Sequence, residues 1–417
     1  MSTALWPYSV FAATLAAAGL PIYIHAPKFY VDEFGVGLAA LGGVLFGLRL
    51  LDVIQDPFLG WLSRRTAQAR AAAVAFAGGV MALSMVGLFA VTPPIAPVAW
   101  FAITLALLFS AFSFLTITFY AQGVRKAAQL GDGGHVKLAS WRETGALLGI
   151  SLASVMPVAL ISITDAPFAV FALAFATIAA IAIYSMRDEW IVTDRSSAVS
   201  FGPVLADPLS RRLLLIALLN ATPVAVSSTL FLFFVESRLG APGWEGPLLL
   251  LFFLAAAGAA PLWAKFASEV GAKRALLTGM VLSILAFGGA AFLGSGDVWT
   301  FALICLASGA ALGADMTLLP AIFARRLEKI VPEAAEGFGL WSFVSKFTLA
   351  FAAVTLLPLL EISGFNPASE MPPGDAALMT LTLTYAVLPC ALKLIALILL
   401  ARTDVREPVG NVALKEA

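Results

Sequence analysis

Long apolar runs, separated by short polar segments, follow one another along the whole chain. Each run has about 20 residues or more, the length that an α-helix needs to cross roughly 30 Å of hydrocarbon. Six runs lie in each half of the chain. They fall near residues 7–26, 38–62, 71–91, 98–122, 138–160, 166–185, 212–235, 246–267, 274–293, 299–323, 337–360 and 377–401. The pattern predicts an all-α membrane protein with twelve transmembrane helices.

The longest polar connection, MRDEWIVTDRSSAVSFGPVLADPLSRR, separates the sixth run from the seventh. We interpret residues 186–211 as a linker between an N-terminal bundle, residues 1–185, and a C-terminal bundle with a short tail, residues 212–417.

A weak internal repeat relates the two halves. The segments DPFLGWLSRRTAQARA and AAPLWAKFASEVGAKRA each place a basic residue thirteen positions after a proline, and they are 204 residues apart. The same offset places Arg142 over Lys346, each in the fifth helix of its half. Internal repeats of this kind are typical of transporters built from two related bundles. The sequence therefore predicts two pseudo-symmetric six-helix bundles.

The distribution of basic residues predicts the orientation. Nineteen of the 25 Lys and Arg residues fall in the alternate loops and tail that we place inside, two fall outside, and four lie within the spans. Cytoplasmic loops carry the excess of Lys and Arg. Both termini are therefore predicted to be cytoplasmic, in a multi-pass protein of the inner (plasma) membrane.

Composition agrees with this assignment and removes other classes of protein. Hydrophobic residues make up 61% of the chain and charged residues 12%, with a mean hydropathy of +0.96, whereas soluble proteins have about 25% charged residues. The formal net charge is zero, which argues against nucleic acid as a partner. The two cysteines, Cys305 and Cys390, lie in apolar runs and are expected to pack as small hydrophobes.

Three charges interrupt the second run. Within GLRLLDVIQDPFLGWLSRR, Asp52 and Asp56 are one helical turn apart on one face, and Arg49 falls within about 60° of both. The neighbours Leu48, Leu50, Leu51, Val53 and Ile54 are expected to face elsewhere. One arginine cannot neutralise two carboxylates. The second one must be protonated, bound to a cation or paired with a base on another helix.

These residues suggest a cation site. Two carboxylates with the amide of Gln55 offer oxygen ligands suited to Na⁺, or a shared site for one proton. The alternative is structural, with Arg49 neutralising one carboxylate and joining two helices.

Further charges lie in other spans. Arg142 and Glu143 are about 100° apart on the fifth helix and are not expected to face the same neighbour; Arg142 could also extend to the cytoplasmic interface. Lys346 lies about ten residues inside its helix and needs a carboxylate or a water-filled cavity, with Asp52, Asp56 and Asp315 as candidate counter-charges. Lys393 is eight residues from the end of the last helix and is expected to reach the interface.

Asp315 follows Gly309 and Gly313, which should allow close helix approach, and could link to the cytoplasmic loop. Three aromatic residues, Tyr120, Trp341 and Phe343, could stack on a sugar ring or an apolar body, or could simply pack.

No catalytic or energy-converting motif is present. The two histidines lack metal-ligand spacing, and no GxxxxGK[ST] phosphate loop occurs. The sequence therefore predicts neither an enzyme nor a bound cofactor. Transport energy would come from an ion gradient or from the gradient of the substrate.

Four segments resemble one known family. RLLDVIQDPFLGW, WRETGALLG, GADMTLLP and EGFGLWSFVSKF are similar to signatures of the glycoside–pentoside–hexuronide:cation symporters, the group of the major facilitator superfamily that includes the melibiose permease. The resemblance implies the major facilitator fold and coupling to H⁺ or Na⁺. It places Asp52, Gln55, Asp56 and the fourth-helix hydroxyl of Ser113 at the cation site, and Arg142 and Lys346 at positions for substrate binding and for linkage to that site.

The chain also departs from this family. Ala16 and Thr116 stand where the family has two sugar-binding aspartates, and Gln55 replaces the usual asparagine, a change that bears on Na⁺ more than on H⁺. ARRLEKI replaces an acidic stretch after the tenth helix.

These features lead to one prediction and several alternatives. We expect cation-coupled symport of a small organic solute, a sugar or glycoside, by a monomer in contact with membrane lipid. Tyr120, Arg142, Trp341 and Lys346 are the candidate substrate residues, and Arg49 and Asp315 complete a charge network. The alternatives are a carrier of lysolipids or other amphiphiles, a drug exporter, whose loop motif GWLSRRTAQAR matches only in part, and a membrane receptor that has lost transport.

Overall fold

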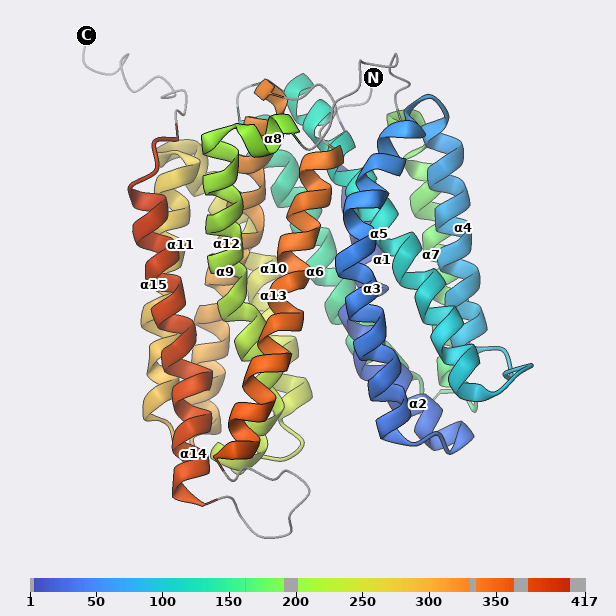
Figure 1. The fold of residues 1–417 in the computed structure, drawn as a ribbon, viewed down its shortest axis with the longest axis vertical. Coiled ribbons are helices and arrows are strands. Elements are labelled where there is room, and N and C mark those ends of the chain that lie inside the picture. Colours follow the sequence, from blue (N-terminus) through green and yellow to red (C-terminus); the bar gives the residue numbers. More distant parts are fainter. Residues whose placement is uncertain are drawn as a thin grey trace. The chain divides into compact units, whose positions relative to one another are not determined.

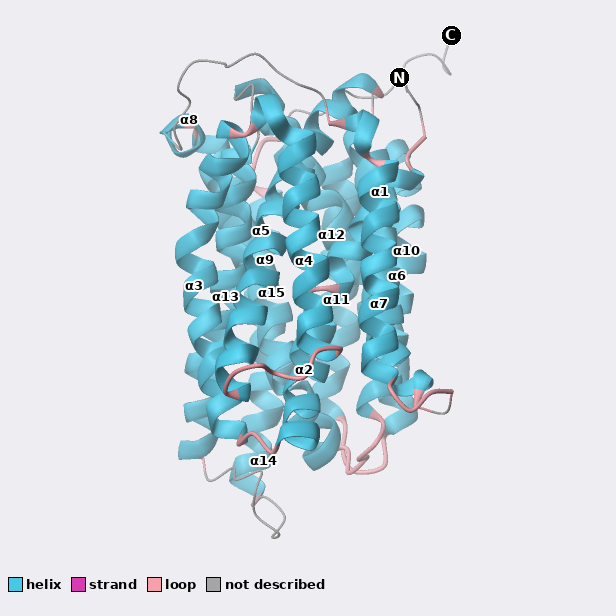
Figure 2. Cartoon of the chain, turned by 90° about the vertical axis from the view of Figure 1, so that its right-hand side faces the viewer, coloured by secondary structure: helices cyan, strands magenta, loops and turns pink. Residues whose placement is uncertain are grey.

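All regular secondary structure in the described part of the chain is helical; the structure is a computed structural model. This part comprises residues 4–131, 133–161, 163–190, 202–330, 335–363 and 374–405. Figure 2 shows helices joined by loops in this part of the chain. The chain divides into two compact units. The first contains residues 1–206 and 327–343, and the second contains residues 207–326 and 344–417.

The first unit is built from the six predicted spans of the N-terminal half (Figure 1). Its helices are α1 (Trp6–Ala17), α2 (Leu20–Phe34), α3 (Leu38–Arg65), α4 (Arg70–Phe89), α5 (Pro97–Gln129), α6 (Gly134–Leu160) and α7 (Pro167–Ser185). The first predicted span, residues 7–26, is therefore two helices. Gly19 leaves the helical conformation with φ −92° and ψ −115°, and Pro21 opens the next helix, where a missing N–H costs nothing.

Short elements follow α7. Residues Arg187–Glu189 form a 3₁₀ turn, η2, and Gly202–Ala206 form α8. Residues 191–201 of the predicted linker lie outside the described residues. The chain from Leu327 to Phe343, which includes the end of α12 and the start of α13, packs with the first unit, whereas the sequence suggested only an N-terminal segment.

The second unit contains the other predicted spans, except residues 327–343 of α12 and α13. They are α9 (Pro208–Phe233), α10 (Glu245–Val270), α11 (Ala272–Gly288), α12 (Val298–Ile330), α13 (Ala335–Ile362), and the pair α14 (Asp375–Thr382) and α15 (Leu388–Ala401). Two π-helical segments, η3 (Phe234–Arg238) and η5 (Leu383–Val387), continue α9 and join α14 to α15. A 3₁₀ segment, η4 (Gly289–Phe292), ends α11.

Glycines set the closest helix contacts in each unit. A Cβ on Gly145 or Gly149 of α6 would lie 2.2 Å from the carbonyl oxygen of Ser9 or 2.3 Å from that of Ala13, both on α1. In the second unit, a Cβ on Gly309 would lie 2.2 Å from the Phe252 carbonyl oxygen of α10. The expectation that Gly309 permits close approach is confirmed. Small residues let the helix backbones approach this closely. In lipid no hydrophobic force drives helices together, so close van der Waals packing contributes to holding them.

The outer surfaces of the helices suit a bilayer. In the described residues, eight helices are long and apolar enough to cross a membrane. Large apolar side chains such as Phe76, Leu83 and Leu285 are 73–74% exposed, which would be costly in water and is expected in lipid. The chain is therefore an integral, multi-pass membrane protein.

Candidate functional site

The two carboxylates of α3 are buried. Asp52 is 3% exposed and Asp56 is fully buried, whereas Leu50, Leu51 and Ile54 point outward with 41–75% exposure. The carboxylates therefore share the inward face of the helix, as the spacing predicts. Leu48 was assigned wrongly. It lies one turn before Asp52 on the same face and is buried.

Asp52 is joined to α5 by two hydrogen bonds. Gln55 Nε2 donates to Asp52 Oδ1 at 3.0 Å, and Ser110 Oγ of α5 donates to Gln55 Oε1 at 3.0 Å. The sequence singled out Ser113 as the hydroxyl of this helix. Ser113 is fully buried one turn beyond Ser110, but Ser110, which the sequence analysis missed, is the residue seen to contact Gln55. Ser110 could have been found because residues one helical turn apart share a face, and Ser113 was already a candidate.

Asp56 is joined to the start of α13. Ser342 Oγ donates to Asp56 Oδ2 at 2.6 Å. Gly339, one turn earlier, lies so close to α3 that a Cβ there would be 3.3 Å from the Asp56 carbonyl oxygen. A hydrogen bond to a carboxylate stabilises its ionised form. Trp341 and Lys346 on the same helix could be predicted from the sequence as candidates, but Ser342 was missed.

A second charged cluster joins α5 to α6. Arg142 Nε donates to Glu143 Oε1 at 2.7 Å, and Tyr120 OH donates to the same oxygen at 3.0 Å. The Arg142 guanidinium carbon lies 3.7 Å from the centre of the Tyr120 ring. The expectation that Arg142 and Glu143 face different neighbours is therefore wrong. Their side chains are long enough to turn back, and both contact Tyr120.

Burial excludes the interfacial role for Arg142. Its side chain is 5% exposed and that of Glu143 is 1% exposed, so the charges neutralise each other inside the unit. Within the described residues, Nη2 of Arg142 is buried without a hydrogen-bond partner. The cluster can thus offer a positive N–H group to an acceptor oxygen, with the Tyr120 ring as a rigid backing.

Three further predicted residues are half-buried. Arg49 precedes Asp52 by one turn on α3, and Trp341 precedes Ser342 on α13. Lys346 follows on α13, in the part assigned to the second unit. Their proposed roles in the charge network and in substrate binding stay predictions.

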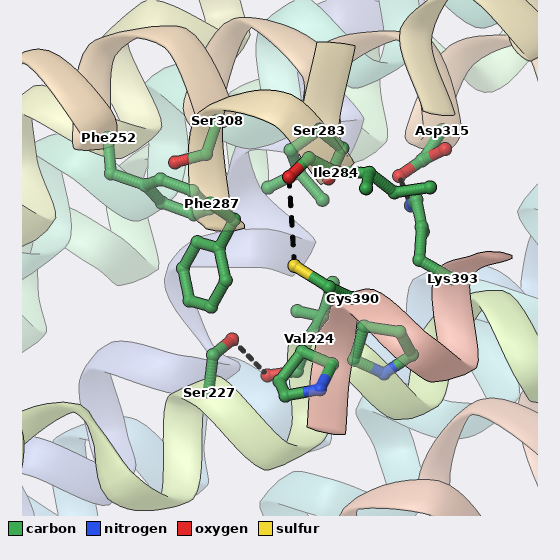
Figure 3. A pocket seen from close by; sticks show the side chains of 13 residues that line it. Val224, Ser227, Phe252, Ser283, Ile284, Phe287, Ser308, Asp315, Cys390 and Lys393 are labelled. Atoms are coloured by element: carbon green, nitrogen blue, oxygen red, sulfur yellow. Dashed lines mark hydrogen bonds and ion pairs between the residues drawn. The ribbon is translucent and has the colours of Figure 1, made fainter. Parts of the chain in front are cut away.

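A third charged pair lies in the second unit, beside a cavity (Figure 3). Lys393 Nζ of α15 donates to Asp315 Oδ2 of α12, and both residues are buried, at 3% and 7% exposure. The expectation that Lys393 reaches the interface is wrong, as is the suggested link from Asp315 to a loop. An α-helix turns each side chain to a fixed side, and here that side faces α12.

A buried ion pair also anchors η2, the turn after α7, to α5. Lys126 Nζ lies 2.7 Å from Glu189 Oε2, and Tyr8 OH donates to the same oxygen at 3.2 Å. Lys126 falls outside the predicted span, residues 98–122, because α5 is longer than that span. The structure places it inside α5, at 3% exposure.

Membrane-length helices around buried, hydrogen-bonded charges are typical of secondary transporters, and the chain is one by its family. It belongs to the major facilitator superfamily, because the family model described as "MFS/sugar transport protein" matches residues 7–407.

Comparison with solved structures supports the same fold. Two crystal structures of a bacterial homologue of the iron transporter ferroportin, in the outward-facing state and in that state with soaked iron, align with TM-scores of 0.70 and 0.69. Both are 14% identical, and each alignment covers 95% of this chain and 98% of the other. No curated protein matches the chain.

Proposed function

We propose that the chain is a cation-coupled symporter of a small organic solute, a sugar or glycoside, with H⁺ or Na⁺ as the coupling ion. The observation that carries this proposal is the pair of buried carboxylates on α3, each hydrogen-bonded to a different helix: Asp52 through Gln55 to α5, and Asp56 to Ser342 of α13. A cation bound between them would neutralise repulsion that a low dielectric strengthens.

The proposed coupling of cation binding to helix movement rests on the hydrogen-bond partners of Asp52 and Asp56. A ligand shifts an equilibrium only by its differential affinity for the two states. Because Asp56 holds the start of α13, a cation that replaces the Ser342 hydroxyl at this carboxylate would change how α13 is held against α3. The hydroxyls of Ser110 and Ser113 and the oxygen of Gln55 would complete a set of hard ligands for Na⁺, if Na⁺ is the ion.

The solute site is proposed at Tyr120, Arg142, Trp341 and Lys346. Arg142 supplies an N–H donor with its charge balanced by Glu143, and the rings of Tyr120 and Trp341 supply stacking surfaces. Arg142 and Lys346 occupy equivalent positions in the two halves of the sequence, 204 residues apart.

The remaining assignments are proposals of the same kind. The partners are the solute, the cation and membrane lipid, without nucleic acid and without a resident cofactor, and a monomer suffices. Both termini are proposed to be cytoplasmic, in the inner (plasma) membrane. Single cysteines introduced near residues 94 and 241 should be labelled by an impermeant reagent from outside only. Labelling of either from the cytoplasm alone would contradict this orientation.

A carrier of lysolipids or other amphiphiles is the second candidate. Ala16 and Thr116 stand where the resembling family has two sugar-binding aspartates, so these positions offer no carboxylate to a sugar. In the described residues the Thr116 hydroxyl is buried without a hydrogen-bond partner. A receptor without transport fits less well, since it would have little use for buried carboxylates.

Uptake into vesicles containing the purified protein decides between these functions. Radiolabelled sugars, glycosides and lysolipids are offered with an imposed Na⁺ gradient, with an imposed pH gradient, and with neither. We expect accumulation of a sugar or glycoside under one of the two gradients. Accumulation of lysolipid alone would support the second candidate, and equal uptake with and without gradients would contradict coupling.

A further inference from the structure

The cavity beside Asp315 lies between helices of the second unit. It has a volume of about 40 Å³ and is lined by residues of α9, α10, α11, α12 and α15 (Figure 3). The charged residues in its wall are Asp315 and Lys393, and the hydroxyls are those of Ser227, Ser283 and Ser308.

Only one of the two carboxylate oxygens of Asp315 accepts a hydrogen bond within the described residues. Oδ2 accepts from Lys393, but within the described residues Oδ1 is buried and has no hydrogen-bond partner. A buried ionised oxygen without a donor is costly, by several kcal/mol in effective terms. The Lys393 ammonium has three N–H donors, of which the bond to Asp315 uses one. The wall thus offers both acceptors and donors.

Charge decides what can fill the cavity. Asp315 and Lys393 already neutralise each other, so an added Na⁺ or anion would leave an uncompensated charge in a low-dielectric interior. A neutral molecule that both donates and accepts hydrogen bonds carries no such cost. One water needs about 10–15 Å³ of cavity volume, so a cavity of about 40 Å³ has room for about three waters.

Prolines of two surrounding helices line the same cavity. Pro223 of α9 and Pro389 of α15 both line it, and the π-helical segment η5 ends directly before α15. A proline inside a helix removes one backbone donor and frees a carbonyl. In membrane proteins such carbonyls are satisfied by neighbouring helices, hydroxyls or ordered water.

We infer that this cavity is a hydration site of the second unit, in which a small cluster of waters hydrogen-bonds to Asp315 Oδ1 and Lys393, beside Pro223 of α9 and Pro389 of α15. None of the residues that line it is among those proposed for the cation or the solute. Its ligand class is water and hydroxylic molecules of similar size.

The two native cysteines provide a matched test. Cys390 lines the cavity, with its thiol 3.7 Å from the Ile284 carbonyl oxygen, whereas Cys305 is 3% exposed in the apolar cluster with Phe234, Phe301 and Tyr385. Cys305→Ala leaves only the cavity thiol, and Cys390→Ala leaves only the core thiol.

Each variant is treated, in vesicles, with methyl methanethiosulfonate, and the rate of modification is measured. Because thiol reactivity requires the thiolate and access to water, we expect Cys390 to react at least about tenfold faster than Cys305. Adding Asp315→Leu and Lys393→Leu together to the Cys305→Ala variant removes both charges and should lower the Cys390 rate toward that of Cys305. All thiols should react alike in denaturing detergent.

Equal slow rates at Cys390 and Cys305 in the native protein would overturn the inference. So would a Cys390 rate that is unchanged by the double leucine substitution, since the thiol would then be reached from lipid rather than from a hydrated cavity. If the leucine variant does not fold, X-ray radiolytic labelling of the native protein replaces it. Residues beside bound water are then oxidised, and the absence of oxidation at Pro223, Cys390 and Pro389 would show a dry cavity.

Discussion

Ser342 Oγ donates a hydrogen bond of 2.6 Å to Asp56 Oδ2, and so joins the start of α13 to a fully buried carboxylate of α3. The two residues are 286 positions apart in the chain. A hydrogen bond to a charged group contributes about 1.5–3 kcal/mol. In the proposed coupling mechanism, this bond would stabilise the carboxylate after the cation has left.

Ser342→Ala is therefore expected to strengthen apparent cation binding. Loss of the donor raises the free energy of the empty, ionised site relative to the loaded one, and 1.4 kcal/mol corresponds to about a tenfold lower half-saturating cation concentration. The measurement is uptake against the concentration of the coupling ion. Ser342→Thr keeps the hydroxyl and should stay near the original value. A weaker cation dependence in Ser342→Ala would instead identify the hydroxyl as a ligand of the cation.

Glu143→Gln is expected to destabilise the first unit. The glutamine can still accept hydrogen bonds from Arg142 and Tyr120, but it leaves the buried guanidinium without a counter-charge. Breaking a buried pair in this way costs about 3–5 kcal/mol. Thermal unfolding in detergent measures the effect. Tyr120→Phe, which removes one hydrogen bond to the same carboxylate, should cost about 1 kcal/mol.

Adding Arg142→Gln to Glu143→Gln should restore part of the stability, because no buried charge is then left unpaired. If the double variant is no more stable than Glu143→Gln alone, the loss has another cause.

Gly149→Ala is expected to separate α1 from α6. The new methyl group would lie 2.3 Å from the Ala13 carbonyl oxygen, and backbone rather than a flexible side chain would have to move. Overpacking of this kind costs about 1–3 kcal/mol or more. Gly79→Ala on α4 is the matched control, since no atom lies within 4 Å of its Cβ position. That change should raise stability by about 0.5–1 kcal/mol. Similar melting temperatures for the two variants would contradict the close packing.

The helices and their inward faces could be predicted from the sequence. A segment that spans a membrane must satisfy its backbone hydrogen bonds internally, which leaves few possible structures. The spacing of Asp52 and Asp56 sets a shared face whatever the other helices do, and the structure buries both. The break at Gly19 and the π-helical η5 were missed because hydropathy counts apolar residues and does not record backbone geometry.

Partners across helices could not be predicted from the sequence. Lys393 and Asp315 are 78 positions apart, and their pairing depends on how α15 packs against the rest of its unit. Ser110 and Ser342 look like any other hydroxyl in an apolar helix, where most such groups bond to their own backbone. Only the packing of α5 and α13 against α3 distinguishes them.

Acid is expected to weaken the junction at the start of α9. Arg326 donates to Asp207, with Nε 2.9 Å from Oδ2, and the backbone N–H of Ser210 donates to the same carboxylate at 2.8 Å. These bonds, that of Arg326 above all, lower the pKa of Asp207 from 3.8 to about 2.

Because the folded-state pKa of Asp207 is lower than the unfolded one, its contribution to stability is complete above about pH 4 and is lost as the pH falls toward 2. The shift corresponds to at most about 2 kcal/mol, less what solvent screens at this partly exposed site.

Asp207→Asn keeps a good helix cap and removes the charge. Its melting temperature should be lower than that of the original protein at pH 6 and should approach it near pH 2.5. Asp188→Asn changes a carboxylate that is 86% exposed and should show no such dependence. A difference for Asp207→Asn that stays constant from pH 6 to pH 2.5 would contradict the assigned pKa.

Asp52→Asn and Asp56→Asn are expected to abolish gradient-driven accumulation of the solute. Each change removes one of the two charges whose repulsion the cation relieves, so the site no longer distinguishes its loaded state from its empty state by charge. Exchange of solute across the membrane without a gradient should survive better than accumulation, since the Arg142 cluster is untouched. Asp32→Asn, at an exposed carboxylate near the end of α2, serves as the control and should accumulate normally. If both α3 variants accumulate solute at the original level under an imposed ion gradient, these carboxylates are structural, and their hydrogen bonds to Gln55 and Ser342 serve to join helices.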